Sequence, residues 1–195
     1  MLASITPLGE RGRRSKWGIT CCGYILGSLL GGASVGTLAG LVGWLAVDGV
    51  PARVRVAVLA AALAIGLVSE LAPGGVPGPR RQVDKRWLDR YRGWVYGLGY
   101  GAQLGAGITT VVVSSAAYAV PLAAFLSARP ATGGAIGAIA GSLRGATVFA
   151  TARVATPERL VAFHARMRIT ERPVRAAALL AQLSLAGLAM LAVAG

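Results

Sequence analysis

Arg144 is the residue of this sequence most suited to chemistry, because its permanent positive charge stands inside a long apolar run, residues 131–152. A charged side chain that faces lipid at the centre of a bilayer costs roughly 2.5–3.5 kcal/mol or more. Arg144 follows Gly141 by three residues and Gly137 by seven, so on a helix it shares their face and points toward a neighbouring helix. The sequence therefore predicts that Arg144 lies inside a membrane protein.

Two amide side chains are predicted at a depth similar to that of Arg144. Counted at about 1.5 Å per residue from the inner helix ends, this depth is about 13 Å. We expect a pocket for a small anion or polar solute, with these substrate-binding residues: Arg144, Gln103, Gln182, Thr109 and Thr110. In the alternative interpretation Arg144 is structural. It then pairs with Glu70, the nearest candidate countercharge, or with backbone carbonyls, and binds no ligand.

The other reactive side chains have no pattern typical of catalysis or metal binding. Cys21 and Cys22 are adjacent, so on a helix their side chains diverge and do not form a CxxC redox pair. His164 is the sole histidine of the sequence, and two thiols are too few for a tetrahedral metal site. We therefore expect no catalytic residues, no metal and no cofactor, and the protein is not predicted to be an enzyme.

The elements that must position these residues are membrane-spanning helices. Of 195 residues, 55% are hydrophobic and only 14% are charged, and the mean hydropathy is +0.63. A soluble domain carries roughly 25% charged residues. Five apolar runs are close to or above the roughly 20 residues that a helix needs to cross a bilayer. They cover residues 18–47, 54–72, 94–127, 131–152 and 174–195.

An all-α bundle of about five crossings is therefore predicted, with four to six compatible with the lengths of the runs. The first and third runs are long enough for a kink or a further crossing, and Pro121 is the expected kink point of the third. Residues 1–17 form a basic N-terminal segment, and residues 18–195 form a single transmembrane domain.

The basic residues predict the orientation of the helices. They gather before the first run, between the second and third, and between the fourth and fifth, whereas the other connections hold only Arg53, Arg55 and Arg129. This alternation follows the positive-inside rule. We expect a cytoplasmic N-terminus and an extracytoplasmic C-terminus. Nucleic-acid binding is not expected, because it would gather the charge on one soluble module.

Glycine recurs every fourth residue in four series within the apolar runs. The series are Gly23, Gly27, Gly31; Gly32, Gly36, Gly40; Gly93, Gly97, Gly101, Gly105; and Gly133, Gly137, Gly141, Gly145. A four-residue step returns to nearly the same face of a helix, so each series makes a shallow groove where another helix packs closely. The sequence predicts glycine-zipper packing, within the chain, in a homodimer or with another membrane protein.

Two of the basic segments have the pattern of amphipathic helices. In the first, apolar residues recur at helical spacing from Val83 to Trp94. The second begins with Thr156 as the expected N-cap and Pro157 as the first helical residue. We expect both to lie on the cytoplasmic surface, where they anchor helix ends or bind anionic lipid headgroups or a protein partner.

The first and third runs begin alike, with KWGITCCGYILGSLLGG and RGWVYGLGYGAQLGAG, which indicates a two-helix repeat. The glycine-rich helices, repeat-like halves and small size resemble the small bacterial permease group that includes CcdA-type cytochrome c biogenesis, LysE and sulfite exporter proteins. The thiol motifs of the thiol carriers are missing. The expected function is that of an inner-membrane permease, or permease subunit, for a small polar or anionic solute. The alternative is a non-catalytic scaffold that packs other membrane proteins through its glycine seams.

Overall fold

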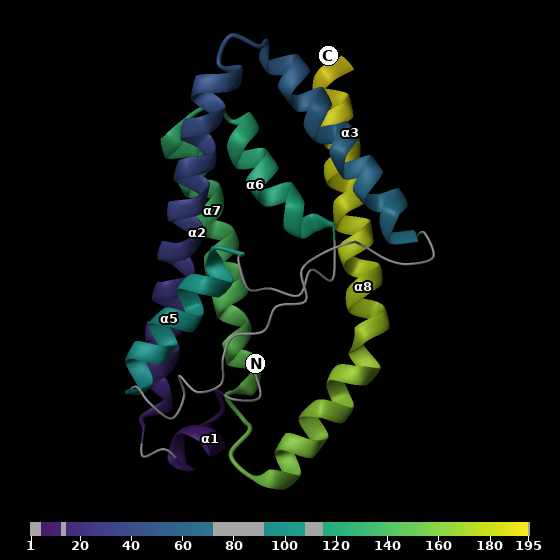
Figure 1. The fold of residues 1–195 in the computed structure, drawn as a ribbon. Helices are drawn as coiled ribbons and strands as arrows, with labels where there is room; N and C mark the ends of the chain where they lie inside the picture. Colours follow the sequence, from purple (N-terminus) through teal and green to yellow (C-terminus); the bar gives the residue numbers. More distant parts are fainter. Residues whose placement is uncertain (1–4, 13–14, 72–91, 108–114, 195) are drawn as a thin grey trace.

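The computed structural model describes residues 5–12, 15–71, 92–107 and 115–194, and the regular structure within these ranges is entirely helical (Figure 1). The elements in chain order are α1 (Pro7–Gly12), α2 (Trp17–Val47), α3 (Ala52–Leu71), α5 (Gly93–Gly105), α6 (Ala116–Leu126), α7 (Pro130–Ala146), the 3-10 helix η2 (Thr147–Thr151) and α8 (Pro157–Ala194). Among the described residues, three helices, α2, α3 and α8, are long and apolar enough to cross a membrane. The predicted all-α character is thus confirmed for the described residues, and these three helices are compatible with the predicted membrane protein.

The third apolar run, for which a tilted helix, a helix kinked at Pro121 or a further crossing was expected, is divided between two described helices. It forms α5, of 13 residues, and α6, of 11 residues, and each is too short to cross a bilayer alone. Gly107 follows the end of α5 with a φ of +72°, a conformation that ends an α-helix and that glycine adopts without steric cost. Pro121, the expected kink point, lies inside α6 instead.

The last helix also differs from the sequence prediction. An amphipathic helix and a separate final span were expected, but α8 is one helix of 38 residues that continues through Pro173. Its start agrees with the prediction, because the backbone N–H of Arg159 donates to Thr156 Oγ1 at 3.4 Å, as in an N-cap. Most of the other predicted amphipathic helix, 83–94, lies outside the described residues.

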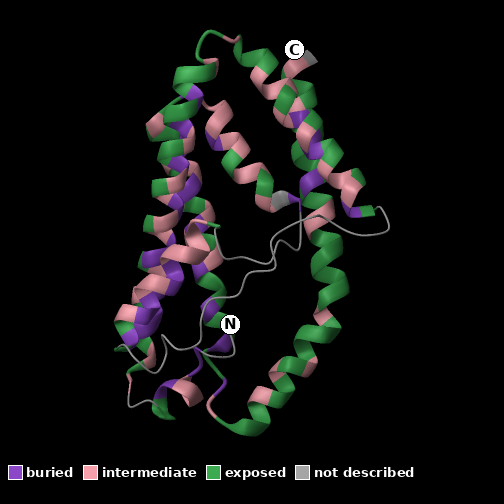
Figure 2. Ribbon diagram, in the orientation of Figure 1, coloured by how far each residue is buried: buried purple, intermediate pink, exposed green. Residues whose placement is uncertain are grey.

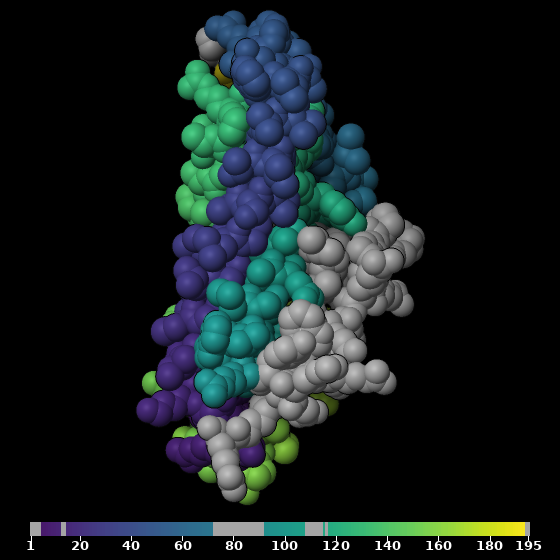
Figure 3. Space-filling view, turned by 60° about the vertical axis from the view of Figure 1, so that its left-hand side comes forward, coloured from purple at the N-terminus to yellow at the C-terminus, as the bar shows by residue number. Residues whose placement is uncertain are grey.

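Helix α2 packs against α7 through glycines on both helices (Figure 3). A Cβ placed on Gly32 would lie 2.2 Å from the carbonyl oxygen of Gly137, and one on Gly137 would lie 2.0 Å from that of Gly32. Gly36 and Gly133 have the same reciprocal relationship, at 2.2 and 2.3 Å. The two backbones therefore approach more closely than any residue with a side chain would allow.

A second close contact joins α2 to α5, which runs in the same direction (Figure 1). A Cβ on Gly27 would lie 2.1 Å from the carbonyl oxygen of Leu98, and one on Gly101 would lie 2.0 Å from that of Tyr24. The segments that begin alike in the sequence thus lie side by side. Because α5 and α7 occupy different faces of α2, both glycine series of α2, Gly23 to Gly31 and Gly32 to Gly40, face other helices of the chain.

The remaining helices form a second, less buried group. Helix α3 packs on α8, and α6 contacts α2, α7 and α3, so α6 connects the two groups. Burial follows this division: buried residues concentrate where α2, α5 and α7 meet, while α3 and α8 are mostly exposed (Figure 2). Large apolar side chains cover the exposed faces, for example Leu38, Leu45, Ile65, Val68, Leu188 and Leu191. Such a surface suits lipid and not water.

Candidate functional site

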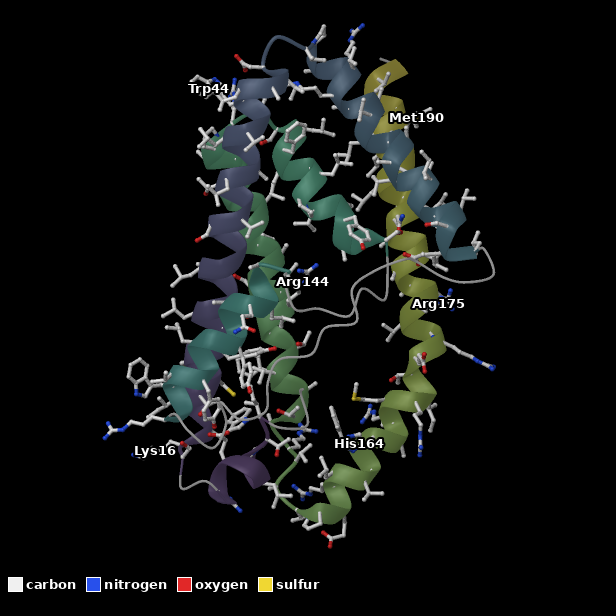
Figure 4. All side chains as sticks on the ribbon, viewed as in Figure 1. Lys16, Trp44, Arg144, His164, Arg175 and Met190 are labelled. Atoms are coloured by element: carbon white, nitrogen blue, oxygen red, sulfur yellow. The ribbon has the colours of Figure 1, made fainter. Side chains whose placement is uncertain are left out.

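Arg144 lies beside the break between α5 and α6, on the wall of a cavity of about 210 Å³ (Figure 4). Four helices form this cavity, and its lining includes Gly32 and Gly36 of α2, Gly107 after α5, Tyr118 and Pro121 of α6, and Gly137 of α7. The glycines of α2 and α7 allow the two helices to meet at the wall of this cavity, because their Cβ positions face the opposite backbone. The cavity is otherwise lined by small and apolar residues, so the guanidinium is its sole charged group among the described residues.

The guanidinium of Arg144 is half-buried and makes no hydrogen bond to another described residue. Its Nη1 atom lies 3.6 Å from the place that a Cβ would take on Gly107. Arg144 is therefore close to the C-terminal end of α5, where the carbonyl groups of the last turn give a helix its partial negative charge. This end of a helix favours a cation.

Glu70 lies at the other side of the break, against the start of α6. Its side chain is only 4% exposed. The carboxylate accepts hydrogen bonds from the backbone N–H of Ser115 and, at 2.7 Å, from the Ser115 hydroxyl. Ser115 is the N-cap residue of α6. The negative charge thus meets the positive end of the helix dipole, which is the favourable arrangement.

Gln182 of α8 completes this second cluster. Its side chain is 3% exposed, and its Nε2 donates to the carbonyl oxygen of Leu63 and to Ser115 Oγ, both at 2.9 Å. Arg175, about two turns earlier on α8, donates to the backbone carbonyl of Glu70 at 2.9 Å. Three helices, α3, α6 and α8, are therefore tied together by polar side chains in an otherwise apolar setting.

The predicted pocket residues do not all meet. Arg144 lines the cavity at the break, but Gln182 binds Leu63 and Ser115 in the separate cluster. Gln103 is half-buried on α5 and is not among the residues that line the Arg144 cavity. Thr109 and Thr110 lie outside the described residues. Two of the hydrogen bonds of the Glu70 side chain come from Ser115 at the start of α6.

Tyr118 links the two sides of the break. It lines the Arg144 cavity, and it also lines a second cavity of about 360 Å³ together with Ser115 and Gln182. The sequence analysis did not single out Ser115 or Tyr118, since serine and tyrosine are common in membrane helices. The one available signal was their position in the third run, after its four-residue glycine series ends at Gly105.

Glu10 is a further buried group that the sequence analysis missed. Its side chain is fully buried; Thr20 Oγ1 of α2 donates to its carboxylate at 2.8 Å, and the Tyr96 hydroxyl of α5 donates to the other oxygen. The N-terminal segment, predicted as a basic extension, is thus joined to the bundle. The backbone of this segment also accepts a hydrogen bond from η2, because Thr151 Oγ1 donates to the Ile5 carbonyl at 2.8 Å. Glu10 could have been noticed in the sequence because acidic residues are scarce: there are seven in all.

No protein family, curated protein or solved structure matches this chain. The resemblance to small permeases therefore rests on the glycine-rich sequence pattern alone. Any functional conclusion has to come from the two clusters at the helix break.

Proposed function

We propose that this protein is a small multi-pass membrane permease, or a permease subunit, that binds a small polar or anionic solute beside Arg144. The observation that carries the proposal is the half-buried guanidinium, without a hydrogen-bond partner among the described residues, on the wall of a cavity at a helix break. A cation that is held in place but left unsatisfied is suited to an anionic ligand.

The broken third run supports a transport role. Membrane transporters commonly bind solutes and coupling ions where a helix is interrupted, because the ends of the half-helices carry partial charges and free backbone groups. Here α5 ends beside Arg144 and α6 begins on Glu70, so both half-helix ends face a side chain of the favourable sign. An interruption of this kind is costly in lipid and is tolerated where it lines a cavity.

We further propose five crossings, in which α5 and α6 together make the third crossing and α7 with η2 makes the fourth. The path of the chain supports this count: α2 and α3 run in opposite directions, and the N-terminal segment and the C-terminus lie at opposite ends of the bundle (Figure 1). The basic segments then lie on the cytoplasmic side of a bacterial inner membrane, with the C-terminus outside. Glycine zippers hold α2 to α5 and to α7.

The scaffold alternative requires open glycine grooves for other proteins. The contacts of α2 with α5 and α7 argue against it, since the glycines on these helices already face one another. The structural alternative for Arg144 requires a protein partner for its charge. Its guanidinium has no hydrogen bond to a described residue, and this favours a ligand-binding role.

Transport by purified protein in liposomes tests the proposal. Uptake of radiolabelled phosphate, sulfate, small carboxylates and amino acids is measured for the wild type, Arg144→Lys and Arg144→Ala at equal amounts of folded protein. We expect Arg144→Ala to lose about tenfold or more of the uptake of the accepted solute, which corresponds to one charged hydrogen bond. Arg144→Lys keeps the positive charge and should retain part of the uptake.

Arg168→Ala is the matched control, because Arg168 is exposed on α8 and does not line either cavity. It should leave uptake unchanged. If Arg144→Ala takes up the solute as well as the wild type, the binding role is wrong. If instead both Arg144 variants fail to yield folded protein while Arg168→Ala folds, Arg144 is structural.

A further inference from the structure

A third cavity, which has basic walls, lies near the end where α8 begins, away from the helix break. It has a volume of about 580 Å³ and lies between the segment around η2 and the first half of α8. Its lining combines three arginines with apolar side chains: Arg153, Arg159, Arg166, Val154, Phe163 and Met167. Thr147 and Thr170 add hydroxyl groups to the wall. Figure 4 shows this end of the protein around His164, below Arg144.

The helical spacing of α8 gathers these side chains on one face. Arg159, Phe163, Arg166 and Thr170 follow one another at intervals of four, three and four residues. No aspartate or glutamate is among the described residues that line the cavity. Glu158 and Glu171, the acidic residues of α8, are exposed and belong to other faces. The cavity is thus a basic site whose charge is not neutralised by its own walls.

The position of the cavity favours one kind of anion. It borders η2, whose Phe149 is 56% exposed, and it lies on the part of α8 that precedes the apolar half of this helix. Basic side chains therefore stand next to a surface that suits lipid. A basic pocket at the cytoplasmic ends of membrane helices is the typical binding site for a phospholipid headgroup. A free phosphate ion would not need the apolar walls that Phe163 and Met167 provide.

We propose that this cavity binds the headgroup of an anionic phospholipid, with its phosphate between Arg159 and Arg166 and its glycerol and first acyl carbons against Phe163 and Met167. The lipid joins the first half of α8 to η2, and through Thr151 to the N-terminal segment. This site is independent of the solute site at Arg144.

Lipid binding to purified protein in neutral detergent micelles tests the proposal. The micelles are doped with phosphatidylglycerol or with phosphatidylcholine, and bound lipid is counted by native mass spectrometry. The test variant is Arg159→Gln with Arg166→Gln. The control is Arg168→Gln with Arg172→Gln, which removes the same charge from the same helix but outside the cavity. We expect the test variant to bind phosphatidylglycerol about tenfold or more weakly, and the control to bind it like the wild type.

Three outcomes would overturn the proposal. Equal weakening in both double variants means that charge alone attracts the lipid. Equal binding of phosphatidylcholine means that the arginines do not select an anion. Competition by soluble glycerol phosphate as strong as by phosphatidylglycerol identifies a free phosphate compound as the ligand. Should the test variant not fold, Arg166→Gln alone replaces it, because the Arg166 side chain makes no hydrogen bond to a described residue.

Discussion

At the scale of single residues, the most consequential feature is the pair of charges on the two sides of the helix break. Arg144 lies beside the C-terminal end of α5, and Glu70 accepts hydrogen bonds at the N-terminal end of α6. Each meets the end of a half-helix whose dipole favours its sign, which lowers the cost of placing a charge in an apolar bundle.

Removal of the Glu70 carboxylate should destabilise the protein. Glu70→Ala leaves the buried Ser115 N–H and hydroxyl without this acceptor, which costs about 1–3 kcal/mol. Thermal unfolding in detergent measures the effect as a lower melting temperature. The control is Glu171→Ala, since Glu171 is exposed on α8. A melting temperature equal to that of the control would mean that the hydrogen bonds to Ser115 contribute nothing.

Glu10 should have a comparable effect at the N-terminal end. Glu10→Ala leaves Thr20 and Tyr96 without their shared acceptor, at a cost of about 1–3 kcal/mol for the buried donors. Because this carboxylate joins α1 to α2 and α5, limited proteolysis should cleave the variant before Trp17 faster than it cleaves the wild type. Unchanged cleavage, with Glu171→Ala as reference, would show that other contacts hold the segment.

At the scale of the elements, α6 is the helix that joins the two groups, and α3 holds both of its ends. Glu70 accepts from the start of α6, while Arg55 Nη1 donates to the carbonyls of Leu126 and Ser127 at its end, each at 3.2 Å. This explains why α3 carries a basic residue on the side where few are expected. An acid at the N-terminal end and a base at the C-terminal end both complement the dipole of α6.

The contact between α2 and α7 predicts a sharp intolerance of side chains. Gly36→Ala would place a Cβ 2.2 Å from the Gly133 carbonyl oxygen, and relief requires the helices to separate. We expect a loss of about 1–3 kcal/mol of stability, the usual cost of overpacking. Gly187→Ala on α8 is the matched control, because nothing lies within 4 Å of that position. It should be neutral or stabilising by up to about 1 kcal/mol, from helix propensity.

Melting temperatures of the two alanine variants measure this difference. If Gly36→Ala is as stable as Gly187→Ala, α2 and α7 do not pack through their glycines in the membrane.

At the scale of the whole molecule, two groups of helices with different burial are connected by one short helix. The group of α2, α5 and α7 is held by backbone contact, whereas α3 and α8 meet α6 through the Glu70, Ser115 and Gln182 cluster. The Arg144 cavity lies where α6 meets the first group. A movement of α3 and α8 relative to the first group would therefore act on this cavity through α6, as rocking-bundle transport requires.

The proposed orientation predicts labelling from opposite sides of the membrane. In a background with Cys21 and Cys22 replaced by serine, Asp48→Cys should react with an impermeant maleimide in intact cells. Arg159→Cys should react only after the inner membrane is opened, since the proposed orientation puts the basic segments on the cytoplasmic side. Reaction of both positions from the same side would contradict the alternation of the connections.

The sequence by itself determined the helical character, the presence of helices apolar enough to cross a membrane, and the faces on which glycine lies. These properties are local: apolar length sets the environment of a helix, and a four-residue period sets its face. Thr156 before Pro157 likewise predicted where α8 begins, because an N-cap depends on neighbouring residues alone.

The tertiary structure alone decided which residues meet. Gln182 binds Ser115, 67 positions away, and Glu10 binds Tyr96, 86 positions away, so neither partner follows from local pattern. The break after Gly107 and the continuity of α8 through Pro173 also depend on what packs around them. A buried polar group takes the partner that the assembled helices bring within hydrogen-bond distance, because in an apolar interior an unsatisfied donor or acceptor costs more than any local preference.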